Sequence, residues 1–156
     1  MKNDGPLWNG SATELNSIPS DSAGAEQKIA KERLMSELSV LVVEDDAVLN
    51  RVIQAALKRA GYRTHASETC ADGLALATRE RPGLLVLDVN LPDGTAWGLL
   101  EDIRRGRPDD EVPIIVISSN RVSRVQLRKN GVDKFFPKPI DMNLFMEAVK
   151  ELLHPP

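Results

Sequence analysis

The stretch GLLVLDVNLPDG, residues 83–94, decides the fold class of this chain. It opens with the apolar run Leu84–Leu87, and a short apolar run bounded by turn residues is typical of a strand buried on both faces. The run ends at Asp88, and a Leu-Pro-Asp-Gly turn follows soon after. An acid at the end of a buried strand indicates a functional site, because parallel sheets bind ligands at the carboxyl ends of their strands.

Short apolar segments occur on both sides of this stretch, and segments with helical spacing separate them. Besides residues 83–89, the expected strands are residues 39–44 (SVLVVE), 62–66, 112–118 (VPIIVIS) and 132–136, with 62–66 at a sheet edge. The expected helices are residues 47–60, 70–79, 95–105, 121–130 and 142–153. Gly61 is expected to end the first helix, and Asp141 to cap the last. Strands alternating with helices predict an α/β fold, with a five-stranded parallel sheet covered on both faces.

The N-terminal part of the chain differs in composition from the rest. Residues 1–23 are rich in Gly, Ser, Asn, Asp and Pro and show no apolar period, which is typical of a disordered segment. Residues 24–38 carry a short apolar stripe at helical spacing. We expect residues 1–37 to be a disordered tail with a short helix over about residues 24–38, and residues 38–156 to form one domain. A partner-binding or dimerising segment is the alternative interpretation of the helix.

The composition indicates a globular protein without disulfides or membrane spans. Hydrophobic residues make up 42% of the 156 residues, and the net charge is −3. The single cysteine, Cys70, excludes an intramolecular disulfide and favours a reducing compartment. No apolar run approaches the roughly 18 residues that a membrane helix needs, and the N-terminus lacks the apolar core of a secretory signal. We expect a cytoplasmic protein with no direct DNA binding, because the net charge is negative.

Polar side chains gather where the expected strands end. The first strand is followed by Asp45 and Asp46 after Glu44, and another strand ends at Asp88. Carboxylates so close together repel unless a cation joins them, and a hard divalent cation such as Mg²⁺ (or Mn²⁺) prefers oxygen ligands. Lys138, after the last strand, suits the oxygens of a phosphoryl group. Asp88 is therefore a candidate nucleophile that forms an aspartyl phosphate.

Four segments resemble the receiver domains of two-component response regulators. They are LVVEDD (41–46), LLVLDVNLPDG (84–94), PIIVISS (113–119) and FFPKPI (135–140). They occur in the order and with the spacing of the family, and the likeness covers roughly residues 38–153. The resemblance implies a doubly wound (β/α)5, flavodoxin-like fold and a phosphoacceptor signalling protein of the stand-alone, single-domain type.

The resemblance implies a role for each residue at the strand ends. Asp88 matches the phosphoacceptor. The metal would be held by the side chains of Glu44, Asp45 and Asp88 and by the backbone carbonyl of Asn90. Asn90 and Asn120 match two positions that tune dephosphorylation.

The remaining matches belong to phosphate binding and switching. They are Ser118 as the switch serine, Phe135 as the switch aromatic, Lys138 as the phosphate-binding lysine, and Pro139 as the residue after a cis peptide bond. Three simpler interpretations stay open. Ser119 serves in place of Ser118 if the register shifts by one residue, Asp46 stabilises a helix N-terminus, and Phe135 is a core residue.

The resemblance also implies partners. A histidine kinase or histidine phosphotransfer protein would supply the phosphoryl group in a Mg²⁺-dependent reaction. Residues 119–136 and the last helix would then change their preference for a downstream protein. We expect no separate output enzyme domain, so the chain would not be an enzyme, although it assists its own phosphorylation and dephosphorylation.

One segment departs from the family pattern. The stretch from Ser118 to Gly131 is shorter than the pattern by a residue or two, carries several basic residues and has few apolar positions. It favours either a solvated face or an acidic partner, and it puts the usual switching in doubt. The alternative function is therefore a receiver-like protein–protein interaction module that does not switch.

Two other uses of a strand-end acid fit the sequence less well. A haloacid-dehalogenase-like phosphatase needs a second acid two residues after the nucleophile, where this chain has Asn90. A flavin-binding module needs a phosphate-cradling loop after the first strand, where Glu44, Asp45 and Asp46 would repel phosphate.

Overall fold

The computed structural model describes residues 21–156, so the disorder expected for residues 1–23 is outside the described part of the chain except at residues 21–23, where the prediction is wrong because these residues are helical. The chain divides into two compact units, Met1–Glu32 and Arg33–Pro156, and the second contains the whole main sheet. Helix α1 spans Asp21–Glu37, in the region where a short helix is expected over residues 24–38.

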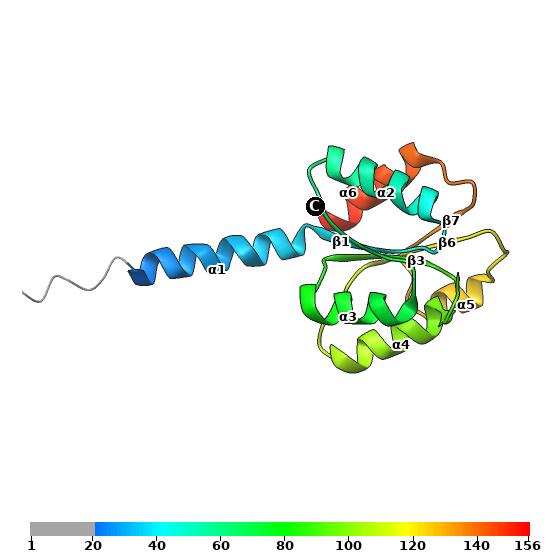
Figure 1. Cartoon of the computed structure of the whole chain (residues 1–156), viewed down its shortest axis with the longest axis horizontal. Coiled ribbons are helices and arrows are strands. Elements are labelled where there is room, and N and C mark those ends of the chain that lie inside the picture. The colour runs from blue at the N-terminus through cyan, green and yellow to red at the C-terminus, as the bar shows by residue number, and fades with distance from the viewer. Residues whose placement is uncertain (1–20) are drawn as a thin grey trace, which may run out of the picture. The chain divides into compact units, whose positions relative to one another are not determined.

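The second unit is built on a five-stranded parallel sheet, as the sequence predicts (Figure 1). Its strands are β1 (Ser39–Val43), β2 (Arg63–Ser67), β3 (Leu84–Asp88), β6 (Ile114–Ser118) and β7 (Lys134–Pro137). They lie in the order β2-β1-β3-β6-β7. The order reverses direction at β1, which is the doubly wound arrangement, and β2 lies at an edge as expected.

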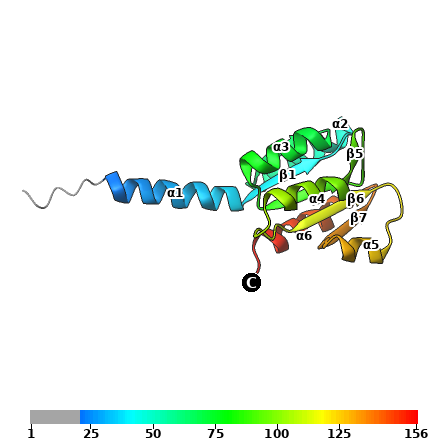
Figure 2. The ribbon, with the colours of Figure 1, turned by 90° about the horizontal axis from the view of Figure 1, so that it is seen from below.

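Helices cover both faces of this sheet. Helices α2 (Ala47–Arg59) and α6 (Met142–Leu153) lie on one face, and α3 (Cys70–Glu80), α4 (Ala96–Gly106) and α5 (Arg124–Lys129) lie on the other (Figures 1 and 2). Alternate residues of a strand point to opposite faces, so β1 contributes Val40 to the core under α2 and α6, and Leu41 to the core under α3 and α4. None of the helices within residues 21–156 is both long and apolar enough to cross a bilayer.

The ends of α2 and α6 are set by residues that the sequence singles out. The Asp46 carboxylate caps α2 by accepting hydrogen bonds from the backbone N–H groups of Val48 and Leu49. Asp141 caps α6 in the same way, as expected. Gly61 follows α2 with a φ of 92°, a left-handed conformation that favours glycine, so its expected role is also confirmed. The interpretation of Asp46 as a helix-terminus residue holds.

A small hairpin after β3 is absent from the sequence expectations. Strands β4 (Asn90–Leu91) and β5 (Gly94–Thr95) pair antiparallel around a two-residue turn. Two-residue strands are too short to show an alternating pattern, so sequence periodicity cannot reveal them. The hairpin fixes the course of the chain just beyond Asp88.

Helix α5 is shorter than the helical spacing over residues 121–130 suggests. It spans only Arg124–Lys129, with Ser123 as the N-cap. None of its residues is buried. Because so short a helix has few internal hydrogen bonds, it depends on packing, and here packing contributes little.

Gly83 gives a test of the packing at the start of β3. A Cβ at Gly83 would lie 1.9 Å from the carbonyl oxygen of Glu37, so Gly83→Ala requires the backbone to move. We expect this variant to lower the free energy of unfolding by about 1–3 kcal/mol in urea denaturation. Gly106→Ala is the matched control, because a Cβ there meets no atom within 4 Å and should leave stability equal or slightly higher. Equal unfolding midpoints for the two variants would contradict the close approach.

Candidate functional site

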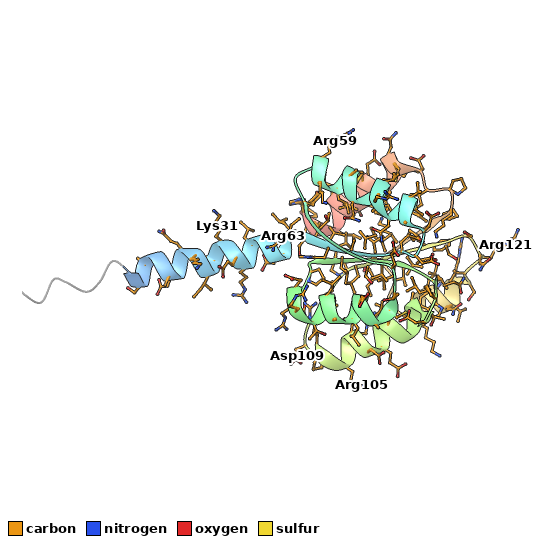
Figure 3. The ribbon with its side chains drawn as sticks, viewed as in Figure 1. Lys31, Arg59, Arg63, Arg105, Asp109 and Arg121 are labelled. Atoms are coloured by element: carbon orange, nitrogen blue, oxygen red, sulfur yellow. The ribbon has the colours of Figure 1, made fainter. Side chains whose placement is uncertain are left out.

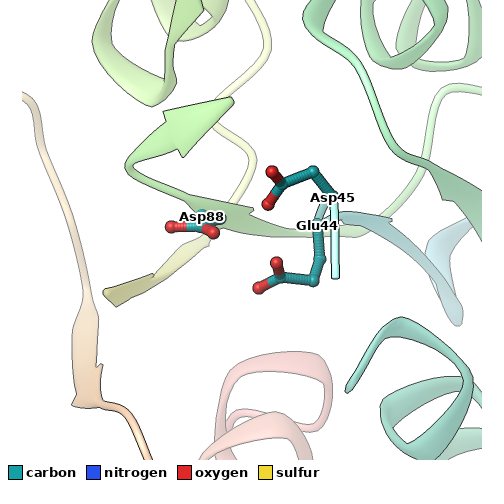
Figure 4. A group of neighbouring side chains, drawn as sticks. All are labelled: Glu44, Asp45 and Asp88. Carbon is teal, nitrogen blue, oxygen red and sulfur yellow. The ribbon is translucent and has the colours of Figure 1, made fainter. Parts of the chain in front are cut away.

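The carboxyl ends of β1 and β3 bring three acidic side chains together. Val43 lies opposite Leu87 in the parallel register, so Glu44 and Asp45 follow β1 directly beside Asp88. Carboxylate oxygens of the three acids lie within 4.8 Å of one another, and Figure 4 shows the three side chains gathered around one space. The structure thus assembles the acids that the sequence proposes as metal ligands.

Lys138 reaches the same site from the end of β7. Its ammonium lies 2.7 Å from Glu44 Oε2 and donates a hydrogen bond of 2.8 Å to Asp88 Oδ2. Burial by itself lowers the pKa of Lys138, but the interactions with Asp88 and Glu44 outweigh it and raise that pKa above its ordinary value. Lys138 therefore stays positively charged between the two carboxylates. Its peptide bond to Pro139 is cis, as the resemblance implies.

Glu44 is the most enclosed acid of the group. Its side chain is fully buried, and its Oε1 accepts a hydrogen bond of 2.9 Å from the Asp46 N–H. Burial raises the pKa of Glu44 to about 7, Lys138 and the Asp46 N–H oppose this rise, and the charge of Asp88 adds to it. Asp45, in contrast, is exposed and faces solvent.

The composition of this group fits a hard divalent cation. Three carboxylates and one ammonium leave two negative charges in excess when all are ionised. The acidic side chains offer only oxygen ligands, and Mg²⁺ typically takes one or two carboxylates with water or phosphate oxygens around it. Glu44, Asp45 and Asp88 are therefore the side chains that would hold Mg²⁺ or Mn²⁺.

The two serines at the end of β6 differ in burial. Ser118 is buried and its hydroxyl oxygen accepts a hydrogen bond of 3.0 Å from the Asn120 N–H, whereas Ser119 is exposed. The backbone carbonyl of Ser118 also accepts a hydrogen bond of 2.9 Å from the Lys138 N–H. Because Ser118 ends the strand beside that of Asp88, the structure favours Ser118 over Ser119 as the serine of the site.

The other residues singled out by the sequence lie around this centre. Asn90 is exposed, and its N–H donates a long hydrogen bond of 3.3 Å to Asp88 Oδ1. Asn120 is exposed on the loop after β6. Phe135 is half-buried on β7 and packs against the core cluster under α3 and α4, so its interpretation as a core residue fits the structure.

Asn50 is a site residue that the sequence analysis missed. Only 4% of it is exposed, and its amide donates hydrogen bonds to the carbonyl oxygens of Glu44 (2.9 Å) and Ser67 (3.1 Å). These bonds tie the chain at Glu44 to the last residue of β2. The sequence could have indicated this role, because Asn50 is a polar residue on the buried face of α2, together with Ile53 and Leu57.

Asp93 anchors the hairpin that follows Asp88. Its carboxylate accepts hydrogen bonds from the N–H groups of Cys70 (2.7 Å) and Ala71 (3.0 Å) at the start of α3. These two bonds lower the pKa of Asp93 below its ordinary value. The loop that carries Asn90 is thereby fastened to the N-terminus of α3, a contact that the sequence analysis did not foresee.

The sequence of this chain is similar to those of known proteins. Residues 40–150 match the sequence profile of the response regulator receiver domain. The photosynthetic apparatus regulatory protein RegA of Rhodovulum sulfidophilum is 31% identical over 121 residues, which is 76% of this chain and 66% of that protein. The KDP operon transcriptional regulatory protein KdpE of Escherichia coli is 34% identical over 103 residues, which is 65% of this chain and 44% of that protein. The chain thus spans under two thirds of the length of these relatives.

Solved structures agree as well. A CheY-like response regulator receiver domain protein from Methanospirillum hungatei superimposes with a TM-score of 0.68 at 27% identity, over 74% of this chain and 92% of that one. The receiver domain of the sensor histidine kinase PA1611 from Pseudomonas aeruginosa superimposes with a TM-score of 0.65 at 26% identity, over 74% and 97% of the two chains. That structure contains a magnesium ion coordinated in its active-site cleft.

The hydrogen bonds of Asn50 are open to a direct test. Asn50→Ala removes the donor of the Glu44 carbonyl oxygen and one of the two donors of the Ser67 carbonyl oxygen, which keeps its hydrogen bond from the Glu44 N–H, so we expect the free energy of unfolding to fall by about 1–3 kcal/mol. Gln54→Ala serves as the control, because it removes only the hydrogen bond that Asn50 Oδ1 accepts. Urea denaturation of both variants measures the difference. If Asn50→Ala were no less stable than Gln54→Ala, the bridge would contribute nothing.

Proposed function

This chain belongs to the response regulator receiver domain family, and from that membership we propose that Asp88 accepts a phosphoryl group in a Mg²⁺-dependent reaction. One observation carries the proposal. The carboxylate of Asp88 lies at the end of a buried strand, hydrogen-bonded to Lys138 and beside two further carboxylates. A nucleophile, a fixed positive charge and a set of oxygen ligands are the parts that phosphoryl transfer needs.

The donor in this proposal is a phosphohistidine on a histidine kinase or a histidine phosphotransfer protein. An oxygen of Asp88 attacks the phosphorus atom, and an O–P bond forms as the P–N bond breaks. The electron pair of the P–N bond stays on the imidazole nitrogen, which takes up a proton. The Lys138 ammonium, already bound to Asp88, stabilises the negative oxygens during transfer and afterwards.

The metal in this proposal is held by Glu44, Asp45 and Asp88 and by the backbone carbonyl of Asn90. When bound, Mg²⁺ supplies positive charge against the phosphoryl oxygens. The excess of two negative charges at the site supports this assignment, as does the magnesium ion in the related PA1611 receiver domain. We further propose that the side chains of Asn90 and Asn120, both of which are exposed, influence how water reaches the phosphoryl group.

The switch in this proposal begins at Ser118. A phosphoryl group on Asp88 adds negative charge and acceptor oxygens, which attract the Ser118 hydroxyl away from its bond to the Asn120 N–H. Movement of Ser118 and of the loop after it changes the packing around Phe135. Residues 119–136 and α6 then show a different surface to a downstream protein.

The partners and the cellular setting belong to the same proposal. The chain acts in the cytoplasm, receives phosphate from its kinase or phosphotransfer protein, and signals by binding rather than as an enzyme with its own substrate. The second candidate function, a receiver-like interaction module that does not switch, draws support from α5, because a helix without buried residues couples weakly to the core. The complete set of Asp88, Ser118 and Lys138 favours the switching function.

Tryptophan fluorescence tests the site assignment. Trp97 is half-buried on α4 and packs against the core cluster, and Trp8→Phe removes the second tryptophan. We expect a saturable change with Mg²⁺ and a further change with beryllofluoride, a phosphoryl mimic. Asp88→Asn should weaken the first response and abolish the second, because it removes a ligand charge and the acceptor oxygen. Asp109→Asn, an exposed acid in the α4–β6 loop, should keep both. A full beryllofluoride response in Asp88→Asn would remove Asp88 from this role.

Lys138→Ala separates metal binding from phosphoryl binding. Without the ammonium, the three carboxylates should still bind Mg²⁺, and binding should tighten or stay equal because a competing positive charge is gone. The beryllofluoride response should be lost or fall by about tenfold or more in affinity, because Lys138 no longer binds the phosphoryl mimic. Lys134→Ala, which removes a lysine of β7 that is paired with Glu151, is the control. An unaltered response in Lys138→Ala would place the lysine outside the mechanism.

A further inference from the structure

The charged residues of segment 119–132, between β6 and β7, are all positive. Between Glu111 and Asp133 there is no acidic residue, and the segment carries Arg121, Arg124, Arg128 and Lys129. All four are exposed. The whole chain has 20 basic and 23 acidic residues, so the rest of the chain, without these four, carries more acidic than basic residues. Positive charge is therefore separated from the acidic residues that dominate elsewhere.

None of these four residues has an ion-pair partner among residues 21–156. Other basic residues do, since Arg105 pairs with Glu101 and Asp102 on its own helix. Arg124 and Arg128 also lie four positions apart on α5, where like charges repel and destabilise a helix. The segment thus has uncompensated positive charge that an acidic partner would neutralise.

An exposed apolar side chain lies in the middle of this charge. Val125 is 75% exposed and lies on α5 between Arg124 and the pair Arg128 and Lys129. Arg121 projects from the loop between β6 and α5, well away from Arg59 and Arg63 (Figure 3). We call Arg121, Arg124, Val125, Arg128 and Lys129 the basic surface. An apolar centre with a charged rim is a common arrangement of a protein-binding patch.

The basic surface is connected to the proposed switch. The loop that leads to it begins at Ser118, whose hydroxyl accepts a hydrogen bond from the Asn120 N–H. Val122 of the same loop packs in the core cluster that Phe135 also contacts. At the other end of α5, Arg104 Nη2 donates a hydrogen bond of 2.5 Å to the carbonyl oxygen of Asn130. Helix α5 has no fully buried residue between these two attachments, so we expect movement of Ser118 and its loop to shift the helix.

The chemistry favours a protein over a nucleic acid as the occupant. Helix α5 has six residues and is about 9 Å long, too short to present several side chains along a DNA groove. The net charge of −3 opposes approach to a polyanion of uniform charge. A short acidic segment with an apolar residue complements both the four positive charges and Val125.

We propose that the basic surface binds an acidic segment of a partner protein, with Val125 against an apolar side chain of that segment, and that the state of Asp88 controls the affinity. The control by Asp88 rests on the proposed function, whereas the charge recognition does not. The partner class of the downstream surface is thereby specified as an acidic, partly apolar polypeptide.

The test uses the full chain and a fluorescein-labelled peptide in which glutamates flank a central leucine and phenylalanine. Anisotropy should show binding that weakens by about tenfold or more as salt rises from about 50 to 300 mM. Arg124→Gln with Arg128→Gln should weaken binding by about fivefold or more, and Val125→Ser should also weaken it. Lys58→Ala with Arg59→Ala removes the same charge from the exposed end of α2 and should leave binding unchanged. A peptide with glutamine in place of glutamate should not bind.

Three outcomes would overturn the proposal. They are no binding of the acidic peptide at low salt, an equal loss of affinity in the two double variants, and tighter binding of a labelled DNA duplex that Arg124→Gln with Arg128→Gln abolishes.

The control by Asp88 is tested separately. Mg²⁺ with beryllofluoride should change the peptide affinity by about threefold or more. An unchanged affinity overturns the control by Asp88, and the Trp97 response of the same samples shows whether Asp88 bound the mimic at all. A normal Trp97 response without peptide binding contradicts the basic surface alone.

Discussion

The placement of one ammonium between two buried carboxylates is the constraint on which this site depends. Glu44 and Asp88 come from neighbouring parallel strands, and burial raises the pKa of Glu44 to about 7 even though the ammonium opposes that rise. Lys138 supplies that ammonium from β7, 50 residues beyond Asp88. It reaches them because β7 lies beside β6, which lies beside β3, so the strand order brings three distant loops to one edge. The three carboxylates that gather there offer the oxygen ligands that a hard divalent cation prefers.

Hydrogen bonds from outside the centre hold its loops in place. Asn50 binds the carbonyl oxygens of Glu44 and Ser67, which joins the loop after β1 to the end of β2. Asp93 binds two N–H groups at the start of α3, which fastens the hairpin beyond Asp88. The first of these is buried, and each uses a side chain to satisfy backbone groups of a distant segment. Reacting groups on loops gain their precision from such attachments.

The two ends of the β6–α5 connection differ in rigidity. Ser118 is buried in the sheet and joined to the site, whereas α5 lies on the surface with no buried residue. Where a buried residue such as Ser118 is connected to a surface helix such as α5, a small change at the buried residue can shift the surface that the helix forms. In the proposed switching function, the short helix α5, which has no buried residue, is the element that we expect to be displaced. Four of the five residues of the basic surface lie on this helix, so a shift of the helix moves these four together.

The sequence by itself determined the five strands, the five helices that alternate with them, and the acids at the strand ends, because apolar periodicity and turn residues are local properties. It also identified Lys138 and Ser118, since their types and spacing match a known pattern. Only the tertiary structure decided that Ser118 rather than Ser119 is buried beside the site, and that α5 is limited to Arg124–Lys129. The roles of Asn50 and Asp93 also follow from tertiary contacts, which they make with residues 17 and 23 positions away in the sequence. Such contacts follow from how strands and helices pack, which no local pattern of residues records.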